Sequence, residues 1–203
     1  MQEESTLQAV LLDRDGVINE EIDLLSRPEQ LRLIEGSAEA IARFNRRGVW
    51  VLVLTNQPVV ARNLCSEAEL QEIHRQLRVL LWDAAQAQLD RIYYCPHHPE
   101  RFHADANPLY RKPCRCRKPG TRMFEMAQRD FRLTPEQCVV VGDSTRDILA
   151  GQRMGMRTIL VQSGYGGKDG KYAVEPDLVL PNLAAAAHYL LRRGGTVELS
   201  RRH

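Results

Sequence analysis

Short apolar runs alternate along the chain with segments in which apolar residues recur every three or four positions. Apolar runs of this length are typical of strands buried on both faces, and the longer periodic segments are typical of helices. The pattern predicts strands over residues 9–12, 49–54, 91–94, 139–141, 158–161 and 178–180, and helices over 37–47, from 66 through 81, over 121–131, from 145 to about 154, and over 183–192. Strands and helices that alternate in this way predict an α/β fold, a parallel sheet with helices on both faces.

Composition and charge narrow the class of protein. A chain of 203 residues with 43% hydrophobic and 27% charged residues is expected to form one domain over residues 1–203. No apolar run approaches the roughly 20 residues that cross a bilayer, and the first residues lack the features of a secretory signal. A net charge of +2 gives little reason to expect a nucleic-acid partner. We therefore expect a cytoplasmic protein with no membrane partner, and a monomer.

Polar residues that can carry chemistry follow three of the predicted strands. Asp13 and Asp15 follow the first strand, Thr55 follows the second, and Asp143 follows the strand at 139–141. Alternate residues of a strand point to the same side, and Gly16 allows the backbone to approach a neighbour closely. Taken alone, the first pair also fits a strand that ends in a polar turn. Because ligands of open parallel sheets bind beyond the carboxyl ends of the strands, we expect these side chains to form one site.

Carboxylates and a hydroxyl in such a place suit phosphoryl transfer. Asp13, Asp15 and Asp143 could hold Mg²⁺, a hard cation that keeps several waters for a phosphate. Asp13 is the predicted nucleophile, which would form an aspartyl-phosphate, and Asp15 is the predicted general acid and base. Thr55 would donate a hydrogen bond to a phosphoryl oxygen, and Lys118 would add positive charge.

Four motifs in order resemble those of the haloacid dehalogenase-like (HAD) phosphatases. They are Asp13-x-Asp15-Gly16-Val17, Leu54-Thr55-Asn56-Gln57, Lys118-Pro119, and Gly142-Asp143-x-x-x-Asp147. The resemblance spans about residues 9 to 162 and implies a Rossmann-like core, Mg²⁺ dependence and the roles given above. It also implies that Asp147 orients Asp143 or Lys118 instead of binding the metal.

A loop rich in cysteine and histidine supplies a second set of metal ligands. Cys95, His97, Cys114 and Cys116 form two tight pairs, which suits a closed tetrahedral zinc site that stabilises the loop at about 95–117. His98 or His103 could replace His97 as the ligand. The alternative is a proline-rich loop with incidental cysteines.

The same loop narrows the resemblance to one group of HAD phosphatases. The segments Tyr93–Pro99 and Cys114–Pro119 are similar to the D-glycero-D-manno-heptose 1,7-bisphosphate 7-phosphatases. That resemblance implies removal of the 7-phosphate on the way to surface polysaccharide precursors, with Asn56 beside the substrate. The chain departs from the expected pattern at Pro58-Val59-Val60 and at Asn63, near the substrate side. Histidinol-phosphate phosphatases share the loop and remain an alternative, as does a zinc-stabilised binding module with a degenerate core.

The number of residues between the first two motifs limits the size of any domain that could cover the cleft. Between Val17 and the helix that begins near residue 37 there is no room for a large cap domain, so the zinc loop and residues 21–25 should roof the cleft. Arg62 and Arg117 are candidates to bind the second phosphate of a bisphosphate, because arginine suits bidentate phosphate contact. The glycine-rich segment at 164–171 lacks the residues of a phosphate-binding loop and is interpreted as a mobile surface loop.

Overall fold

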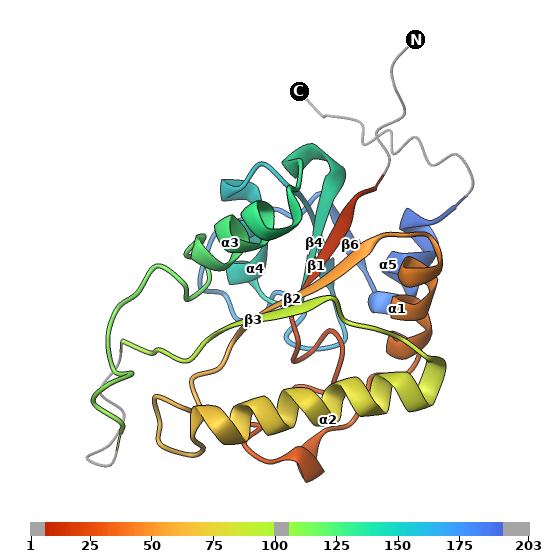
Figure 1. Cartoon of the computed structure of the whole chain (residues 1–203). Helices are drawn as coiled ribbons and strands as arrows, with labels where there is room; N and C mark the ends of the chain where they lie inside the picture. Colours follow the sequence, from red (N-terminus) through yellow and green to blue (C-terminus); the bar gives the residue numbers. More distant parts are fainter. Residues whose placement is uncertain (1–6, 100–105, 193–203) are drawn as a thin grey trace.

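Six parallel strands form one sheet in the computed structural model, which describes residues 7–99 and 106–192 (Figure 1). The strands are β1 (Ala9–Leu12), β2 (Trp50–Asn56), β3 (Arg91–Cys95), β4 (Cys138–Gly142), β5 (Arg157–Val161) and β6 (Leu178–Leu180). Their order across the sheet is β3-β2-β1-β4-β5-β6. Every predicted strand is present, and β2 runs two residues farther than predicted, so that Thr55 and Asn56 belong to the strand and not to a turn.

Helices cover both faces of the sheet, as the alternating pattern predicted. On one face lie α1 (Ser37–Arg46), α2 (Glu67–Ala85) and α5 (Leu183–Leu190), and on the other lie α3 (Arg122–Phe131) and α4 (Thr145–Arg153) (Figure 1). Two short 3-10 helices, Pro28–Gln30 and Pro135–Gln137, were not predicted. Three residues are too few to show a helical period, so the sequence pattern could not reveal them.

The position of β1 between β2 and β4 in the sheet explains why its sequence is apolar throughout. Val10 and Leu12 pack into the core on the side of α1, α2 and α5, whereas Ala9 and Leu11 pack against α3 and α4. All four are buried, because successive side chains of a strand point to opposite faces and helices cover both.

The order of the strands places a crevice beside β1. The chain moves from β1 to β2 and β3 on one side, then crosses to β4 on the other side of β1. The main-chain N–H of Asp13 donates to the carbonyl of Val141 at 3.0 Å, which holds the ends of β1 and β4 together. Such a reversal of strand order is where open α/β sheets bind their ligands.

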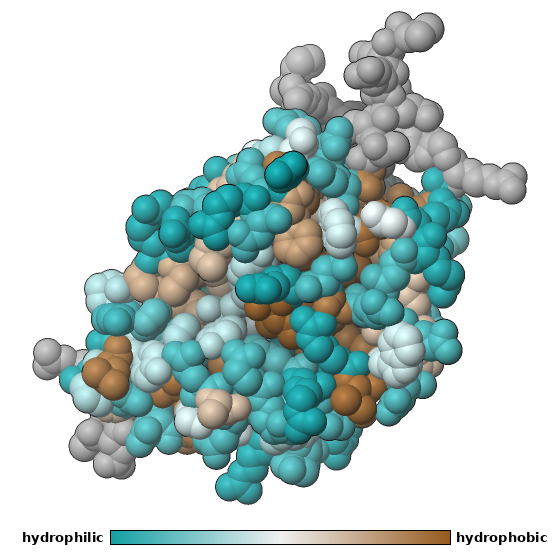
Figure 2. Space-filling view, in the orientation of Figure 1, coloured by the Kyte–Doolittle hydropathy of each residue, from teal (hydrophilic) through white to brown (hydrophobic). Residues whose placement is uncertain are grey.

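The surface carries mostly polar side chains on the face shown in Figure 2, with hydrophobic residues in smaller groups among them. Among the helices that the structure describes, none combines the length and the apolar character that crossing a membrane requires.

A substitution at Phe44 tests the packing of α1 on the sheet. Its side chain is fully buried in the core cluster, so Phe44→Ala should lower the free energy of unfolding by about 3–5 kcal/mol, through lost burial and the cavity that remains. Urea denaturation measures the change. Arg46→Ala, on the exposed last turn of the same helix, is the matched control and should change stability by no more than about 0.5 kcal/mol. Equal effects of the two substitutions would contradict this account of the core.

Candidate active site

The ends of β1 and β4 bring three carboxylates together. Asp13, Asp143 and Asp147 each have an oxygen within 4.8 Å of the others, although 130 positions separate the first two in the chain. Asp147 lies on the first turn of α4, where its carboxylate accepts hydrogen bonds from the main-chain N–H and the hydroxyl of Ser144. The predicted convergence of Asp13 and Asp143 is present, and Asp147 completes the cluster.

A buried lysine neutralises part of this acidic cluster. The ammonium of Lys118 lies 3.0 Å from Asp13 and 2.6 Å from Asp147, and it donates to the carbonyl of Leu54 at 2.6 Å. Burial alone would lower the pKa of Lys118, but the two carboxylates outweigh burial and raise it. Lys118 is therefore a fixed positive charge beside Asp13.

The carboxylates of the cluster still hold more negative charge than one lysine balances. Burial, with repulsion from Asp147 and Asp15, raises the pKa of Asp13 to about 6 despite the attraction of Lys118. Burial, with repulsion from Asp13 and Asp147, raises the pKa of Asp143 to about 8. Asp147 differs, because Lys118 and Arg146 overcome the effect of burial and lower its pKa. A cation placed between Asp13 and Asp143 would relieve the repulsion.

The carboxylate of Asp15 lies in a separate network of hydrogen bonds. The fully buried Arg14 donates to it from Nε at 3.0 Å and from Nη2 at 2.8 Å, and Asn19 and Gln57 each donate at 2.8 Å. Burial would raise the pKa of Asp15, but the Arg14 charge and these hydrogen bonds outweigh burial and lower it. The structure thus brings Asp15 to the site without adding its carboxylate to the acidic cluster.

The last two residues of β2, Thr55 and Asn56, have different surroundings. The amide of Gln57 bridges Asp15 and the hydroxyl of Thr55, to which it donates at 2.8 Å. The Thr55 hydroxyl accepts that bond, so its own hydrogen remains available for a ligand. The amide of Asn56 instead accepts from the main-chain N–H of Lys118 at 2.9 Å and donates to its carbonyl at 3.2 Å. Asn56 therefore fixes the position of Lys118.

The glycine-rich segment forms part of this site, which sequence reasoning missed. A Cβ on Gly164 would lie 2.1 Å from an oxygen of Asp143, and a Cβ on Gly16 would lie 2.3 Å from the same oxygen. The main-chain N–H of Tyr165 donates to that carboxylate at 2.7 Å. The loop thus packs on Asp143 instead of lying apart on the surface, and only the Gly-rich composition of the segment, which permits close approach, could have indicated this.

A pocket of about 470 Å³ lies at the carboxyl ends of the strands. The residues described above that line it are Asp13, Asp15, Thr55, Asn56, Gln57, Asp143 and Tyr165, whereas Lys118 and Asp147 are buried and do not line it. Residues 21 and 23–25 and the loop residues His98 and Arg117 form part of its wall, as predicted for the roof of the cleft. The acids of the pocket are Asp13, Asp15, Glu21, Asp23, Asp143 and Asp169, and its cations are Arg62, Arg117, Arg146 and Lys171. Burial, followed by repulsion from Asp15, raises the pKa of Glu21 to about 7.

The four cations share one neighbour in the pocket wall. Burial, together with the positive charges of Arg117, Arg62, Lys171 and Arg146, lowers the pKa of His98 to about 4. Their charges thus act together on one side chain, although they come from four separate segments. The pocket thus combines acids, which could hold a metal ion, with cations, which could bind phosphate.

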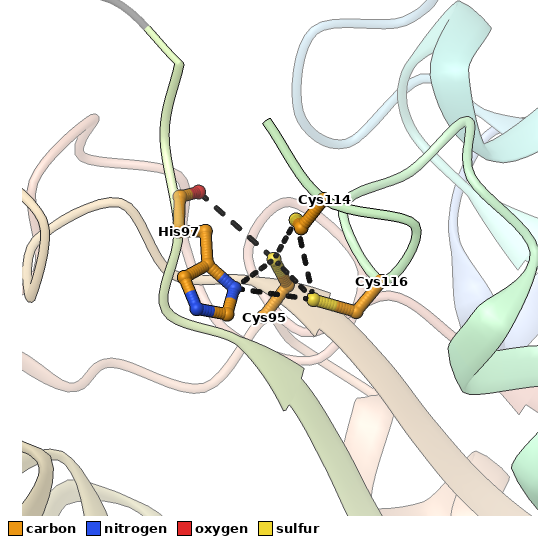
Figure 3. Close-up of side chains that lie close together, drawn as sticks. All are labelled: Cys95, His97, Cys114 and Cys116. Carbon is orange, nitrogen blue, oxygen red and sulfur yellow. Dashed lines mark hydrogen bonds between the residues drawn. The ribbon is translucent and has the colours of Figure 1, made fainter. Parts of the chain in front are cut away.

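The predicted zinc ligands converge on one point (Figure 3). The sulfur atoms of Cys95, Cys114 and Cys116 lie 3.0 to 3.5 Å apart, and Nδ1 of His97 lies 3.3 Å from the sulfur of Cys116 and 3.8 Å from that of Cys95. Ligands of a tetrahedral zinc ion are separated by about 3.3 to 3.8 Å. The three thiols are free and not paired in disulfides, so the cluster could hold one zinc ion.

The structure also separates the two adjacent histidines. The ring of His97 faces the three sulfur atoms, whereas His98 lines the pocket. His103, the other alternative ligand, lies outside the described residues. Arg117 follows the last cysteine, and its Nη1 donates to the carbonyl of His97 at 3.4 Å.

Comparisons with known proteins agree with this geometry. Residues 115–186 match the family model described as HAD-hydrolase-like. The chain is 37% identical, over 90% of its length and 94% of the relative, to the D-glycero-D-manno-heptose-1,7-bisphosphate 7-phosphatase of Thermosynechococcus vestitus. It is 34% identical, over 90% of its length and 98% of the relative, to the D-glycero-beta-D-manno-heptose-1,7-bisphosphate 7-phosphatase of Haemophilus ducreyi.

A solved structure extends the similarity to the whole fold. The D,D-heptose 1,7-bisphosphate phosphatase of B. bronchiseptica, solved with magnesium and phosphate, superposes with a TM-score of 0.79 at 33% identity. The match covers 91% of this chain and 98% of that protein. This chain therefore belongs to the HAD-like hydrolases, in the family of the heptose-1,7-bisphosphate 7-phosphatases.

Proposed function

We propose that the protein is a Mg²⁺-dependent phosphatase that removes the 7-phosphate of D-glycero-D-manno-heptose 1,7-bisphosphate. The observation that carries the proposal is the position of Asp13, which lies beside Lys118 and Asp143 in a pocket that four cationic side chains also line. The names of the relatives agree with this substrate. We further propose a monomeric, cytoplasmic enzyme without a membrane partner, and the near-neutral net charge gives no reason to expect a nucleic-acid partner.

The residues fit a magnesium ion. Burial raises the pKa of Asp13 and of Asp143, repulsion from Asp147 adds to both, and Mg²⁺ prefers carboxylate oxygens. Asp15 was also predicted as a ligand. Arg14, Asn19 and Gln57 already donate hydrogen bonds to the Asp15 carboxylate. The oxygen of Asp15 that remains for Mg²⁺ is therefore its main-chain carbonyl, which is also a ligand that Mg²⁺ accepts. The ion would supply positive charge to the phosphoryl oxygens and hold Asp13 ionised.

In the first step, an oxygen of Asp13 attacks phosphorus, and the bond from phosphorus to the sugar oxygen breaks. Lys118 and the Thr55 hydroxyl stabilise the charge on the phosphoryl oxygens. Asp15 delivers a proton to the departing sugar oxygen, then takes one from the water that cleaves the aspartyl-phosphate. Because the pKa of Asp15 is lowered, the proton must arrive with the substrate, whose phosphate has a second pKa of about 6.

The zinc cluster has an indirect role in this proposal. Four protein ligands leave no open position on a tetrahedral ion, so zinc would stabilise the loop without performing chemistry. By fixing Cys116, it would set the position of Arg117 and Lys118, the next two residues.

Two alternatives remain in view. A histidinol-phosphate phosphatase would use the same acids and zinc loop, but its substrate has one phosphate and gives the cations Arg62 and Arg117 no second phosphate to bind. A binding module with a degenerate core would not need Asp13, Lys118 and Thr55 in a complete arrangement. The complete acidic cluster favours an enzyme over a binding module, and the four cations that line the pocket favour a substrate with a second phosphate.

Asp13→Asn tests the nucleophile and the class of function. The neutral amide cannot form the acyl-phosphate, so release of phosphate from heptose 1,7-bisphosphate with Mg²⁺ should fall by about a thousandfold or more. Asp83→Asn, an exposed acid on α2 that does not line the pocket, is the matched control and should retain full activity. Faster hydrolysis of histidinol phosphate by the parent protein would reject the heptose substrate, and no release from any phosphate ester would support the binding module.

Asp143→Asn tests the metal site through the dependence of stability on pH. A carboxyl group whose pKa is raised on folding binds its proton more tightly in the native state, so its ionisation destabilises the native state progressively from about pH 4 to about pH 8. Without Mg²⁺, the variant should therefore gain more in melting temperature at pH 8 than at pH 5. Added Mg²⁺ should stabilise the parent more than the variant at pH 8. A gain independent of pH, or equal stabilisation by Mg²⁺, would contradict the assignment.

Cys114→Ser tests the zinc site by metal content. We expect about one zinc ion per parent chain by atomic absorption, substantial loss of zinc in the variant, and a lower melting temperature. Cys65→Ser is the matched control, because Cys65 is buried away from the cluster and should leave the zinc content unchanged. Full zinc occupancy in Cys114→Ser would exclude this cysteine as a ligand.

A further inference from the structure

Arg14, the residue between the two aspartates of the first motif, is fully buried and does not line the pocket. A guanidinium without access to the pocket cannot bind the substrate itself. A buried charge is costly unless a partner compensates it, and Arg14 forms an ion pair with the carboxylate of Asp15 at 2.8 Å. We therefore expect any influence of this guanidinium on the reaction to pass through Asp15.

The two carboxylate oxygens of Asp15 accept different numbers of hydrogen bonds. Oδ1 accepts from Nε and Nη2 of Arg14, at 3.0 and 2.8 Å, and from the amide of Asn19 at 2.8 Å. Oδ2 accepts from the amide of Gln57 at 2.8 Å, and it shares Nη2 of Arg14 with Oδ1, also at 2.8 Å. Because a carboxylate oxygen has two lone pairs, three donors leave Oδ1 no room for a proton. Oδ2 need only release the shared contact to carry one.

Main-chain hydrogen bonds fix the turn that carries this arrangement. The N–H of Arg14 donates to the carboxylate of Asp13 at 2.7 Å. The carbonyl of Arg14 accepts from the N–H of Ile18 at 2.8 Å and from that of Asn19 at 3.2 Å. Two of the residues that donate to the Asp15 carboxylate thus belong to the same hydrogen-bonded turn as Asp15, so its orientation is set before a substrate binds.

Helix α2 supplies one polar residue near Arg14. His74 is 3% exposed, and the other buried residues of this helix are apolar. Burial, followed by the positive charge of Arg14, lowers the pKa of His74 to about 3, so the ring is neutral and keeps one nitrogen as an acceptor. Within the described part of the chain, neither ring nitrogen of His74 nor Nη1 of Arg14 has a hydrogen-bond partner. A neutral ring is the kind of acceptor that Nη1 requires.

We propose that Arg14 is a positioning residue, supported from α2 by His74, that orients Asp15 so that Oδ2 gives the proton to the departing sugar oxygen. This inference rests on the proposed function, in which Asp15 is the general acid. In that step the bond from phosphorus to the sugar oxygen breaks, and this oxygen takes the proton from Oδ2. The guanidinium sets the orientation because it donates from two nitrogens in a fixed, planar fork. An ammonium group would keep the charge and lose the orientation.

The experiment compares two substrates that differ in one atom. The first is heptose 1,7-bisphosphate, and the second carries sulfur in place of the oxygen that links carbon 7 to phosphorus. A thiolate leaves without a proton, so the sulfur ester does not need the general acid, whereas its other contacts with the protein are unchanged. The ratio of kcat/KM for the oxygen ester to kcat/KM for the sulfur ester therefore measures proton delivery. The ratio is also independent of the fraction of active protein.

Two substitutions test the two parts of the proposal. Arg14→Lys keeps the positive charge without the fork and should lower the ratio by about tenfold or more, since general acid catalysis contributes about a hundredfold to ten-thousandfold. His74→Leu should lower the ratio by about threefold, as for one ordinary hydrogen bond. It should not lower the melting temperature, because it removes buried polar atoms that have no partner.

Two control substitutions leave Asp15 and Arg14 untouched. Arg78→Lys makes the same change at a partly buried arginine of α2 that does not line the pocket. Leu77→Met makes a volume-conserving change at a fully buried residue of the same helix. Both variants should keep the parent ratio.

The outcomes separate this inference from the proposed function. If the parent protein does not hydrolyse the bisphosphate, the proposed function fails. If it does, and Arg14→Lys slows both esters equally or slows neither, the inference is wrong and the proposed function stands. A fall of the same size in either control would also overturn the inference, because the effect would then come from a general disturbance of α2. Circular dichroism verifies the fold of each variant, and if Arg14→Lys does not fold, the ratio in His74→Leu decides.

Discussion

The ion pairs of one buried ammonium group hold the site together. Lys118 is 3% exposed, and burying such a charge costs several kcal/mol unless partners compensate it. Its partners come from separate parts of the chain: Asp13 after β1, Leu54 in β2 and Asp147 in α4. The same contacts that stabilise the charge therefore fix the nucleophile relative to the strand ends. A lysine exposed to water could neutralise charge but could not align three elements.

The position of Lys118 also explains why the zinc loop lies beside the proposed magnesium site. Lys118 lies two residues after Cys116. The side-chain amide of Asn56, in β2, binds both the main-chain N–H and the carbonyl of Lys118. The loop is long and carries few apolar residues, so its own packing offers little to hold it. A closed metal cluster at the end of β3 anchors it, and the anchor lies close in sequence to the charge that the chemistry needs.

Much of the fold and of the acidic site could be predicted from the sequence. The strands were recognisable because helices cover both faces of the sheet, and Asp13 and Asp143 followed from the position of strand ends. The network around Asp15 could not be predicted, because Arg14, Asn19 and Gln57 carry ordinary polar side chains whose partners depend on the folded backbone. The loop that carries Tyr165 was misread for a similar reason: its contacts are with residues outside the loop, from Asp143, 22 positions away, to Asp23, 142 positions away, and no local period records them.

The close packing of Gly16 and Gly164 around one carboxylate limits how the active site can be redesigned. Any side chain at Gly164 would collide with Asp143, so that position cannot vary even though it lies in a loop. Gly170 has space for a Cβ, but its φ of +56° disfavours any side chain, and Asp169 binds Thr145. The exposed Lys168 and Lys171 have no such restriction. Libraries that aim to change the sugar accepted by this scaffold should therefore diversify Lys168 and Lys171 and leave Gly164 untouched.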